Sequence, residues 1–472
     1  MRLRHLSAAG AVIAAMVGCS GSTQVASGLR EDGGTGSTSG RGSSGTASGG
    51  SAGGTGGTTA GTGGTSGATA GGTGSSGTGG SASDGGGDGG SDMGPTPPEP
   101  GVNYPFPQNR HYANCTYPAY SNADVLAAYT KWKSDLVTAT GANGFRRVQR
   151  SAAENFPNET VSEGIGYGMI LAVYMNDQSL FDDLWQYEQS VLDPSHLMNW
   201  LIAANGSVDG SNGTGSATDA DEDMAWGLLM ADKQWGTSAK LGAYLTIAKQ
   251  QISNIWLGDV YMSKLPNLGD NWGSGAGWTT LNISYFAPAY YRVFKTVDPD
   301  DDWDATIQTT YDTITNNLNA ANGNQSNGLV PGFSSSTGTA PAASGEQGNF
   351  KYQYDACRTP FRIGIDWCIN GEPRAKAYVA LTNSFFGGIG AAKTVDGYQM
   401  NGTPSGTAPA SPFVGPAGVG AMSDATYSTF AQGAYQWLLG NPQQGGQYYA
   451  ESWTAISLVM MSGNFLDYTN LP

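Results

Sequence analysis

The chain has 472 residues and a formal net charge of −16 at pH 7, from 38 acidic and 22 basic side chains. This balance argues against nucleic acid or an anionic membrane surface as a partner, and it is compatible with a neutral or a cationic ligand. The chain has three histidines. A zinc site or a Ser-His-Asp triad would depend on His111 or His196, because His5 lies in an N-terminal leader. We therefore expect carboxylates to carry any acid–base chemistry, without a metal or a cofactor.

The leader, residues 1–18, reads as a signal peptide in which Arg2 and Arg4 precede an apolar run. That run is too short to span a bilayer. It ends at Cys19 after small residues, which resembles a bacterial lipoprotein box whose cysteine is lipidated after cleavage. Ordinary secretion with an incidental Cys19 is the alternative. We expect an exported protein, held at the cell surface of a bacterium if the cysteine is lipidated.

Two segments of different composition follow. Residues 19–100 are mostly Gly, Ser, Thr and Ala, which predicts a disordered linker because too little apolar surface can be buried. Residues 101–472 are rich in aromatics and long enough for one large core, and we expect this domain to be a monomer. It holds Cys115, Cys357 and Cys368, an odd number. Whether Cys357 and Cys368 pair or remain buried thiols is left open by the sequence.

Apolar residues recur with helical spacing through most of the domain. About a dozen helices in one domain favour an all-α toroid. No βαβ alternation or series of hairpins is evident, although short strands could lie in the loops. Long loops at 199–217, 263–281 and 322–357 carry Trp, Tyr, Asn and Gly, and functional residues tend to lie on such loops. The predicted helices are 122–138, 162–176, 179–192, 219–234, 238–256, 282–296, 301–320, 358–370, 373–387, 422–440 and 449–462.

The most acidic stretch is residues 217–226, ATDADEDMAW, at the start of a predicted helix. Thr218 or Asp219 could cap this helix, and acidic residues in a first turn suit its dipole. However, Asp219 and Asp223 share the face that the following leucines mark as partly buried. Buried carboxylates are unfavourable unless they are paired, bound to metal or used in chemistry. A calcium loop of the EF-hand type is excluded, because methionines stand where it needs Gly and Glu.

Two further carboxylates have unusual neighbours. Glu163 begins a predicted helix whose first turns hold three glycines. Glycine weakens a helix, so its presence suggests that something approaches the backbone closely; a capping box or a surface acid is the alternative. Asp355 lies among aromatic residues and near Arg358, which would favour its ionised form. A structural ion pair is the alternative there.

Carboxylates that flank a bond are the usual means of cleaving a glycosidic linkage. Aromatic side chains in or beside the long loops could stack on sugar rings, although each alone is more often part of the core. These are Trp200, Trp272, Trp278 and Tyr285. No Gly-x-Ser-x-Gly elbow or P-loop marks a nucleophile or a nucleotide site.

Three separated motifs, in order, resemble those of glycoside hydrolase family 8, a family of inverting endoglucanases with an (α/α)6 barrel. They are SEGIGYG at 162–168, ATDADEDMA at 217–225 and YDACR at 354–358. One departure is Gly227, where the family has Ser or Ala. The resemblance covers most of residues 101–472 and implies the (α/α)6 barrel fold.

The resemblance also implies roles for individual residues. Glu163 would be the general acid and Asp355 the general base, so the first must hold its proton while the second is ionised. Asp219 would be the third carboxylate, at the subsite where the sugar ring is distorted. Tyr354 and Arg358 would orient the base.

The implied substrate is a polysaccharide, with sugar rings stacked on Trp200, Trp272 and Tyr285. We expect a tethered endo-β-1,4-glucanase that acts on cellulose or mixed-linkage glucan. Xylan and chitosan are alternatives, and the acidic charge would suit cationic chitosan. A glycan-binding lipoprotein without activity is a further alternative, which retention of all three carboxylates argues against.

Overall fold

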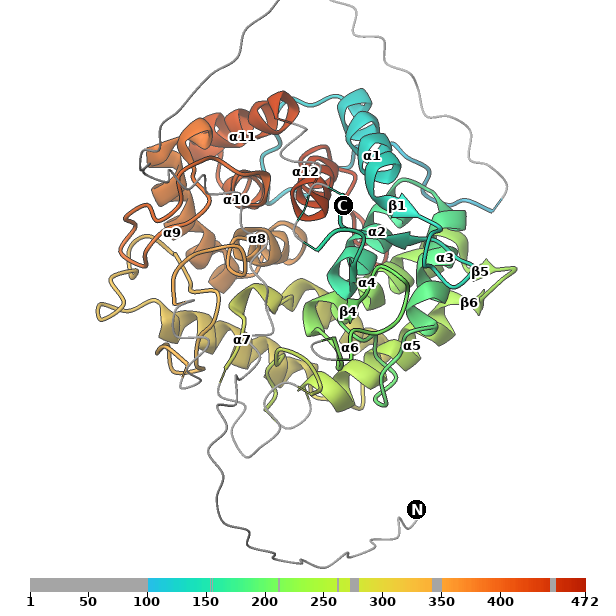
Figure 1. The fold of residues 1–472 in the computed structure, drawn as a ribbon. Helices are drawn as coiled ribbons and strands as arrows, with labels where there is room; N and C mark the ends of the chain where they lie inside the picture. Colours follow the sequence, from blue (N-terminus) through green and yellow to red (C-terminus); the bar gives the residue numbers. More distant parts are fainter. Residues whose placement is uncertain are drawn as a thin grey trace, which may run out of the picture. The chain divides into compact units, whose positions relative to one another are not determined.

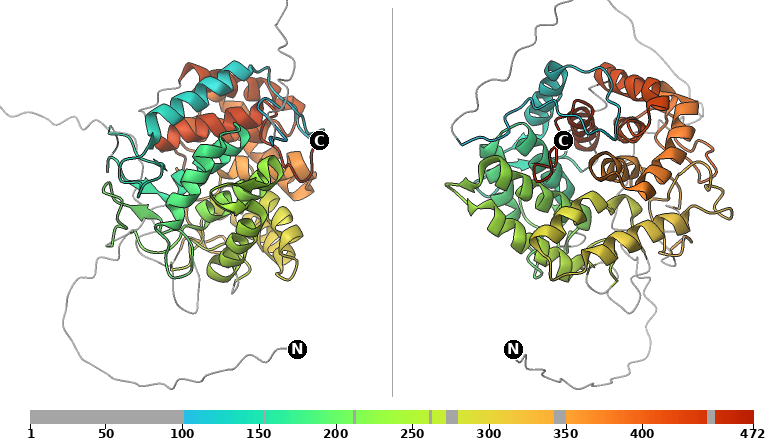
Figure 2. Two further views of the ribbon diagram at one scale, coloured as in Figure 1. Left: turned by 90° about the vertical axis from the view of Figure 1, so that its right-hand side faces the viewer. Right: turned by 180° about the vertical axis from the view of Figure 1, so that it is seen from behind.

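The computed structural model describes residues 101–152, 154, 156–210, 213–260, 263–271, 280–341, 350–441 and 447–472. Within them lie twelve α-helices, in alternating inner and outer positions (Figures 1 and 2). No helix in these ranges has the length and apolar character needed to cross a membrane. The inner helices are α2 (Ser162–Tyr174), α4 (Thr218–Trp235), α6 (Pro288–Val297), α8 (Thr359–Asn370), α10 (Ser411–Ala421) and α12 (Tyr448–Met461). The outer helices are α1 (Asn122–Leu136), α3 (Gln178–Gln189), α5 (Tyr244–Ile255), α7 (Trp303–Asn317), α9 (Pro373–Ile389) and α11 (Ser428–Gly440).

The inner helices close a ring. Helix α2 packs against α4 and α12, and the pairs α6–α8, α8–α10 and α10–α12 are also in contact. Helix α4 meets α6 through Trp226 and Tyr290, whose ring centroids are 4.3 Å apart in a stacked arrangement. Each outer helix packs on the inner helix that precedes it in the chain, and α1 packs on α12. This arrangement confirms the predicted (α/α)6 barrel.

Burial distinguishes the two layers. Nearly every residue of α2, α4, α10 and α12 is buried, as expected of helices that contact protein on all sides. The outer helices bury one face; α1, for example, buries Val125, Tyr129, Trp132 and Leu136. Helical periodicity in the sequence is clearest for the outer helices, because their residues alternate between the core and the solvent.

Three short antiparallel pairs of strands lie in the loops, as the sequence allowed. They are β1 (Val137–Thr138) with β2 (Arg147–Val148), β3 (Thr160–Val161) with β4 (Leu201–Ile202), and β5 (Thr237–Ser238) with β6 (Gly242–Ala243). In the second pair Val161 lies opposite Leu201. The Ser162 N–H then donates to the Trp200 carbonyl at 2.9 Å, so this pair fixes the start of α2.

Helix α10 was not predicted, and the predicted helix 422–440 begins only at Ser428. Helix α10 contains Pro416 and several glycines, which disfavour a helix locally. Its neighbours explain the glycines, because a Cβ on Gly415 would lie 2.4 Å from Ser457 Oγ and one on Gly418 would lie 2.6 Å from Ala434 Cβ. Helix α10 packs closely against both α11 and α12, and this packing requires glycines. The same glycines lower the helix propensity of the segment, which is why the sequence did not predict the helix.

Two other predicted boundaries differ. The predicted helix 238–256 begins at Tyr244, because the preceding residues form the β5–β6 turn. The predicted helix 282–296 divides into a 3-10 helix, η2 (Ile283–Tyr285), and α6, which begins at Pro288. Proline suits a first helical turn but not a helix interior.

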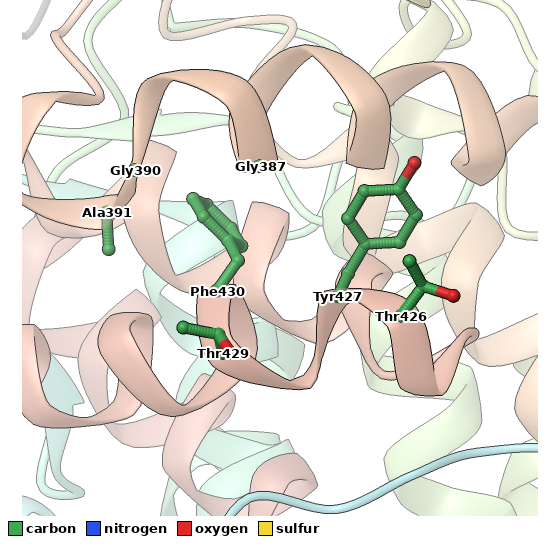
Figure 3. A pocket seen from close by; sticks show the side chains of 7 residues that line it. All are labelled: Gly387, Gly390, Ala391, Thr426, Tyr427, Thr429 and Phe430. Carbon is green, nitrogen blue, oxygen red and sulfur yellow. The ribbon is translucent and has the colours of Figure 1, made fainter.

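A surface pocket of about 290 Å³ lies between the C-terminal part of α9 and the start of α11 (Figure 3). The Tyr427 and Phe430 side chains point from the second segment toward the first. None of the predicted site residues lines this pocket. Its lining is Gly387, Gly390, Ala391, Thr426, Tyr427, Thr429 and Phe430.

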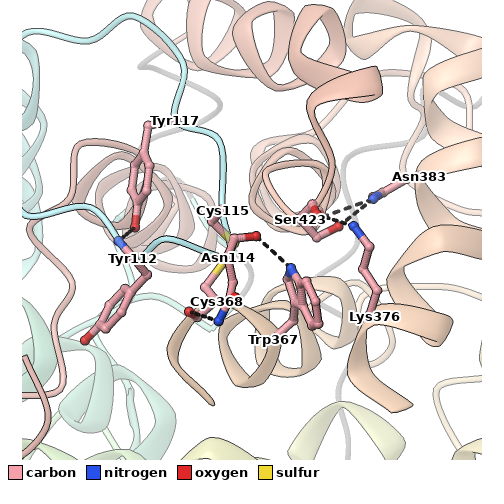
Figure 4. Close-up of a disulfide and its surroundings, with 10 residues drawn as sticks. Tyr112, Asn114, Cys115, Tyr117, Trp367, Cys368, Lys376, Asn383 and Ser423 are labelled. Atoms are coloured by element: carbon pink, nitrogen blue, oxygen red, sulfur yellow. Dashed lines mark hydrogen bonds between the residues drawn. A yellow bond between two sulfur atoms is a disulfide. The ribbon is translucent and has the colours of Figure 1, made fainter. Parts of the chain in front are cut away.

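A disulfide joins Cys115 to Cys368, with their Cα atoms 5.3 Å apart (Figure 4). The Trp367 indole N–H donates to the Asn114 carbonyl at 2.8 Å beside it. A Cys357–Cys368 pair, left open by the sequence, is therefore wrong, and Cys357 is a buried free thiol. Cys357 precedes α8 and Cys368 lies near its end, and about 1.5 Å of rise per residue places them too far apart to bond.

Candidate active site

Three predicted site residues lie at the N-terminal ends of inner helices, where a tyrosine from the start of a fourth inner helix joins them. Glu163 and Asp219 are the second residues of α2 and α4, and Arg358 is the N-cap residue of α8. Tyr448 is the first residue of α12. Hydrogen bonds between these side chains show that the four ends meet.

Arg358 is the centre of this group. Its Nη1 donates to Glu163 Oε2 and to Asp219 Oδ2, and to the Tyr167 hydroxyl at 3.2 Å. Its Nε donates to Ser284 Oγ at 3.0 Å. The Arg358 side chain is 1% exposed, against 18% for Glu163 and 2% for Asp219. One buried cation thus lies between two carboxylates that come from different helices.

This arrangement raises the pKa of Asp219. Burial raises its pKa to about 7, with the Arg358 cation opposing the shift and the Glu163 charge adding to it. Two carboxylates around a single cation repel each other in a medium of low dielectric, so one of them favours its neutral form. The pKa of Asp219 therefore lies well above the usual range of an aspartate.

Glu163 is held at both carboxyl oxygens. The Tyr448 hydroxyl donates to Oε1 at 2.5 Å, while Arg358 donates to Oε2. The N-cap residue of α2 is Val161, without a side-chain cap, so the capping-box alternative for Glu163 is excluded. A carboxyl group that is fixed on both sides and partly exposed is suited to reach a bound ligand in one orientation.

The glycines that follow Glu163 serve helix packing. A Cβ on Gly166 would lie 3.0 Å from Asp223 Cβ and 3.1 Å from the Ala220 carbonyl, both on α4. A Cβ on Gly168 would lie 2.7 Å from a methyl group of Leu184. The close approach expected from the sequence is therefore confirmed, and helices α4 and α3 make it.

The acidic start of α4 is not a capping site, which corrects our expectation for Thr218 and Asp219. The N-cap residue is Ala217, and no side chain caps this helix end. Asp223 instead forms a buried pair with Arg362, whose Nη2 lies 2.7 Å from Asp223 Oδ2. The burial of Asp219 and Asp223 on one face is confirmed.

Asp355 lies in the turn before α8 and is half-buried. Its N–H donates to Gln353 Oε1 at 3.0 Å, and Gln353 Nε2 donates to Asp355 Oδ2 at 2.8 Å. Two residues further along this turn, the Cys357 thiol donates to the Tyr354 carbonyl at 3.1 Å. The Tyr449 hydroxyl donates to the same carbonyl at 3.0 Å, so α12 holds the turn that carries Asp355.

Tyr285, in η2, is within electrostatic range of all three carboxylates. Its ring centroid is 5.1 Å from the Arg358 guanidinium carbon. Its pKa is well above the ordinary tyrosine range, first because of burial and then because of the charges of Asp219, Asp355 and Glu163, which Arg358 opposes. The structure therefore brings together the three carboxylates that lie up to 192 positions apart in the sequence (355 − 163).

The predicted aromatic contacts have different outcomes. Trp200 is 6% exposed and lies at the β4 end of the second strand pair, and its sugar contact stays a prediction. Trp272 and Trp278 lie outside the described residues. The role of Arg358 and Tyr354 in orienting Asp355 also stays a prediction, and the bonds of Arg358 to Glu163 and Asp219 add a second role.

Sequence reasoning missed Tyr448, Tyr167 and Gln353. None of them carries a charge or lies in a run of polar residues, so composition alone does not mark them. Tyr167 accepts an N–H from the Trp453 indole at 3.2 Å and from Arg358. Its adjacency to Glu163, one helical turn away, was the one usable signal.

The chain forms an (α/α)6 barrel with carboxylates gathered at one end of its inner helices, and carboxylates that flank a bond are the usual means of cleaving a glycosidic linkage. The family model of Glycosyl hydrolases family 8 matches residues 104–463, and the chain belongs to this family. Endoglucanase 2 of Ruminiclostridium josui is 37% identical over 372 residues, which cover 76% of this chain and 77% of that protein.

Two further comparisons agree. A protein named Beta-glucanase from Niallia circulans is 32% identical over 395 residues, 78% of this chain and 92% of that protein. The apo structure of a beta-1,3-1,4-glucanase from Paenibacillus sp. X4 has a TM-score of 0.70 at 30% identity, over 77% of this chain and 99% of that chain. The protein is therefore a glycoside hydrolase of the endoglucanase type.

Proposed function

We propose that the protein cleaves β-1,4-glucan inside the polymer chain, with inversion at the anomeric carbon, using Glu163 as general acid and Asp355 as general base. The observation that carries this proposal is the pair of separately held carboxylates around Tyr285. Glu163 is fixed by Tyr448 and Arg358, and Asp355 by Gln353. The names of the relatives, endoglucanase and beta-glucanase, support the substrate class.

In the proposed reaction Glu163 gives its proton to the glycosidic oxygen as the bond from that oxygen to the anomeric carbon breaks. A water molecule attacks the anomeric carbon from the opposite face and passes a proton to Asp355. The product carries the inverted configuration. This route requires the two carboxyl groups to stand roughly 6.5–9.5 Å apart, with space for the water between them.

Asp219 has a different proposed role. Its carboxyl is bonded to the Arg358 guanidinium, which fixes its position and leaves the activation of water to Asp355. We assign it to hydrogen bonds with the sugar at the cleavage site, where a distorted ring brings hydroxyl groups close. A pKa near 7 lets this carboxyl accept or donate such a bond as the charge on the ring changes.

The decisive assay measures reducing ends released from carboxymethyl-cellulose, lichenan, xylan and chitosan in parallel. We expect the highest activity on the two glucans, with xylan and chitosan as the alternatives from the sequence. NMR of the first product anomer tests inversion. Glu163→Gln and Asp355→Asn should each reduce turnover by a factor of at least about 100 and still bind cello-oligosaccharides; full turnover in either variant would refute the assignment.

We also propose that the protein is exported and that residues 19–100 tether the catalytic domain to a lipid at Cys19. The Cys115–Cys368 disulfide supports export, since such bonds persist in oxidising compartments. Labelling of cells with a radioactive fatty acid should mark the wild-type protein and leave Cys19→Ser unlabelled. Equal labelling of both would contradict the anchor, and retention of the unprocessed leader would contradict export.

A further inference from the structure

Gln353 makes two reciprocal bonds with one residue. Its Oε1 accepts the Asp355 N–H at 3.0 Å, and its Nε2 donates to Asp355 Oδ2 at 2.8 Å. A single side-chain amide therefore holds both the backbone and the carboxylate of Asp355. The motifs in the sequence assign Gln353 no role.

The amide is itself held in place. Gln353 is 5% exposed, and its backbone carbonyl accepts the N–H groups of Ala356 at 2.8 Å and Cys357 at 3.0 Å. The preceding Tyr352 exchanges two backbone bonds with Tyr398, of 2.9 and 2.8 Å. Gln353 thus starts a rigid turn, and little freedom is left to its side chain.

Gly332 covers the other side of the amide. A Cβ at this position would lie 2.4 Å from Gln353 Nε2 and 3.1 Å from Asp355 Cβ. The Gly332 N–H is bonded to the Lys351 carbonyl at 3.0 Å, so its backbone cannot easily retreat. Two segments therefore leave the amide one position, against the carboxylate.

We infer that Gln353 is a positioning residue for the general base: its amide fixes the plane of the Asp355 carboxylate and keeps it ionised for water activation. The inference rests on the proposed role of Asp355. The physical basis is that an N–H donor bonds an ionised carboxylate more strongly than a neutral one. Donation to Oδ2 also stops rotation of the carboxylate, which keeps the oxygen that accepts the proton in line with the attacking water.

The test compares Gln353→Met and Gln353→Glu with the wild-type enzyme on a soluble glucan, over a range of pH. Methionine retains the length of the side chain and removes the donor, so kcat should fall about ten- to hundredfold with KM within about twofold. The acid limb of the kcat/KM profile should move up by about one pH unit, and by about two in Gln353→Glu, where a second carboxylate repels the ionised base.

Gly332→Ala is an independent second variant, because its methyl group must displace the amide. It should shift the same acid limb in the same direction as Gln353→Met. Gln308→Ala is the matched control, since its Nε2 makes a similar bond of 2.9 Å to Asp312 on an exposed face of α7. Circular dichroism and thermal unfolding report whether each variant folds.

The outcomes separate this inference from the proposed function. If Asp355→Asn is inactive while folded Gln353→Met keeps the wild-type acid limb and kcat, the positioning role is wrong and the base assignment stands. If Asp355→Asn keeps full turnover, the proposed function fails first. A fall in kcat with an unmoved acid limb in both Gln353 variants would show a purely structural residue and also refutes the inference.

Discussion

Replacement of Arg358 by methionine tests how the site holds its carboxylates. The guanidinium is 1% exposed and lies between Glu163 and Asp219, which are 18% and 2% exposed. Methionine fills similar space but donates no hydrogen bond, so both carboxylates lose their cation. Removal of one partner from a buried ion pair costs about 3–5 kcal/mol, and we expect the free energy of unfolding to fall by about this amount at neutral pH.

The loss should depend on pH. Burial already raises the pKa of Asp219 to about 7 against the opposing Arg358 charge, and without that charge the pKa rises further. A carboxyl that binds its proton more tightly in the folded than in the unfolded chain stabilises most below its unfolded pKa, about 4. That stabilisation is lost as pH rises through the folded pKa. The deficit of Arg358→Met should therefore be small near pH 4 and largest above about pH 7.

Urea unfolding from pH 4 to pH 8 measures this deficit. A double-mutant cycle with Asp219→Asn should give a coupling energy of about 1–3 kcal/mol, because the second substitution removes one of the stranded carboxylates. Arg374→Met is the control. Arg374 is 40% exposed and paired with Glu372, so its removal should cost less than about 1 kcal/mol. A deficit that is equal at every pH, or strictly additive substitutions, would refute the reasoning.

Three further predictions concern other parts of the barrel. Tyr448→Phe removes the hydroxyl bonded to Glu163, the proposed general acid, and should lower kcat about tenfold with little change in KM. Steady-state kinetics with an unaltered kcat would contradict this. Cys115→Ser with Cys368→Ser opens a loop with a sequence separation of 253 and should lower the unfolding free energy by up to about 5 kcal/mol, measured by urea titration; unchanged stability would count against the bond. Burial raises the pKa of Glu188 to about 8 and of Asp193 to about 6, so both bind protons more tightly when folded. Thermal stability should therefore decline from about pH 4 to pH 8, and a rising profile would show that other groups dominate.

Much of the helical barrel could be predicted from local patterns. Helix α1 begins at Asn122 as predicted, and α4 ends at Trp235 before Gly236, because apolar spacing and terminal residues act within a few positions. Helix α10 could not be predicted in this way, since Pro416 and its glycines have low helix propensity. Those residues are explained by the close approach of α11 and α12, whose contacts lie far away in the sequence.

The sequence by itself determined which family the chain belongs to, and it predicted which three carboxylates carry the chemistry. Glu163, Asp219 and Asp355 stand in motifs that are specific over a few residues, and the acidic stretch at the start of α4 is the plainest of them. Only the tertiary structure decided how they are held: Arg358 between two helix ends, Tyr448 from the C-terminal helix, and the amide of Gln353 on the base. The physical reason is the distance along the chain over which each kind of interaction acts. Helix propensity and motifs act between neighbours in the chain, whereas hydrogen bonds and pKa values depend on groups that meet only after the barrel closes.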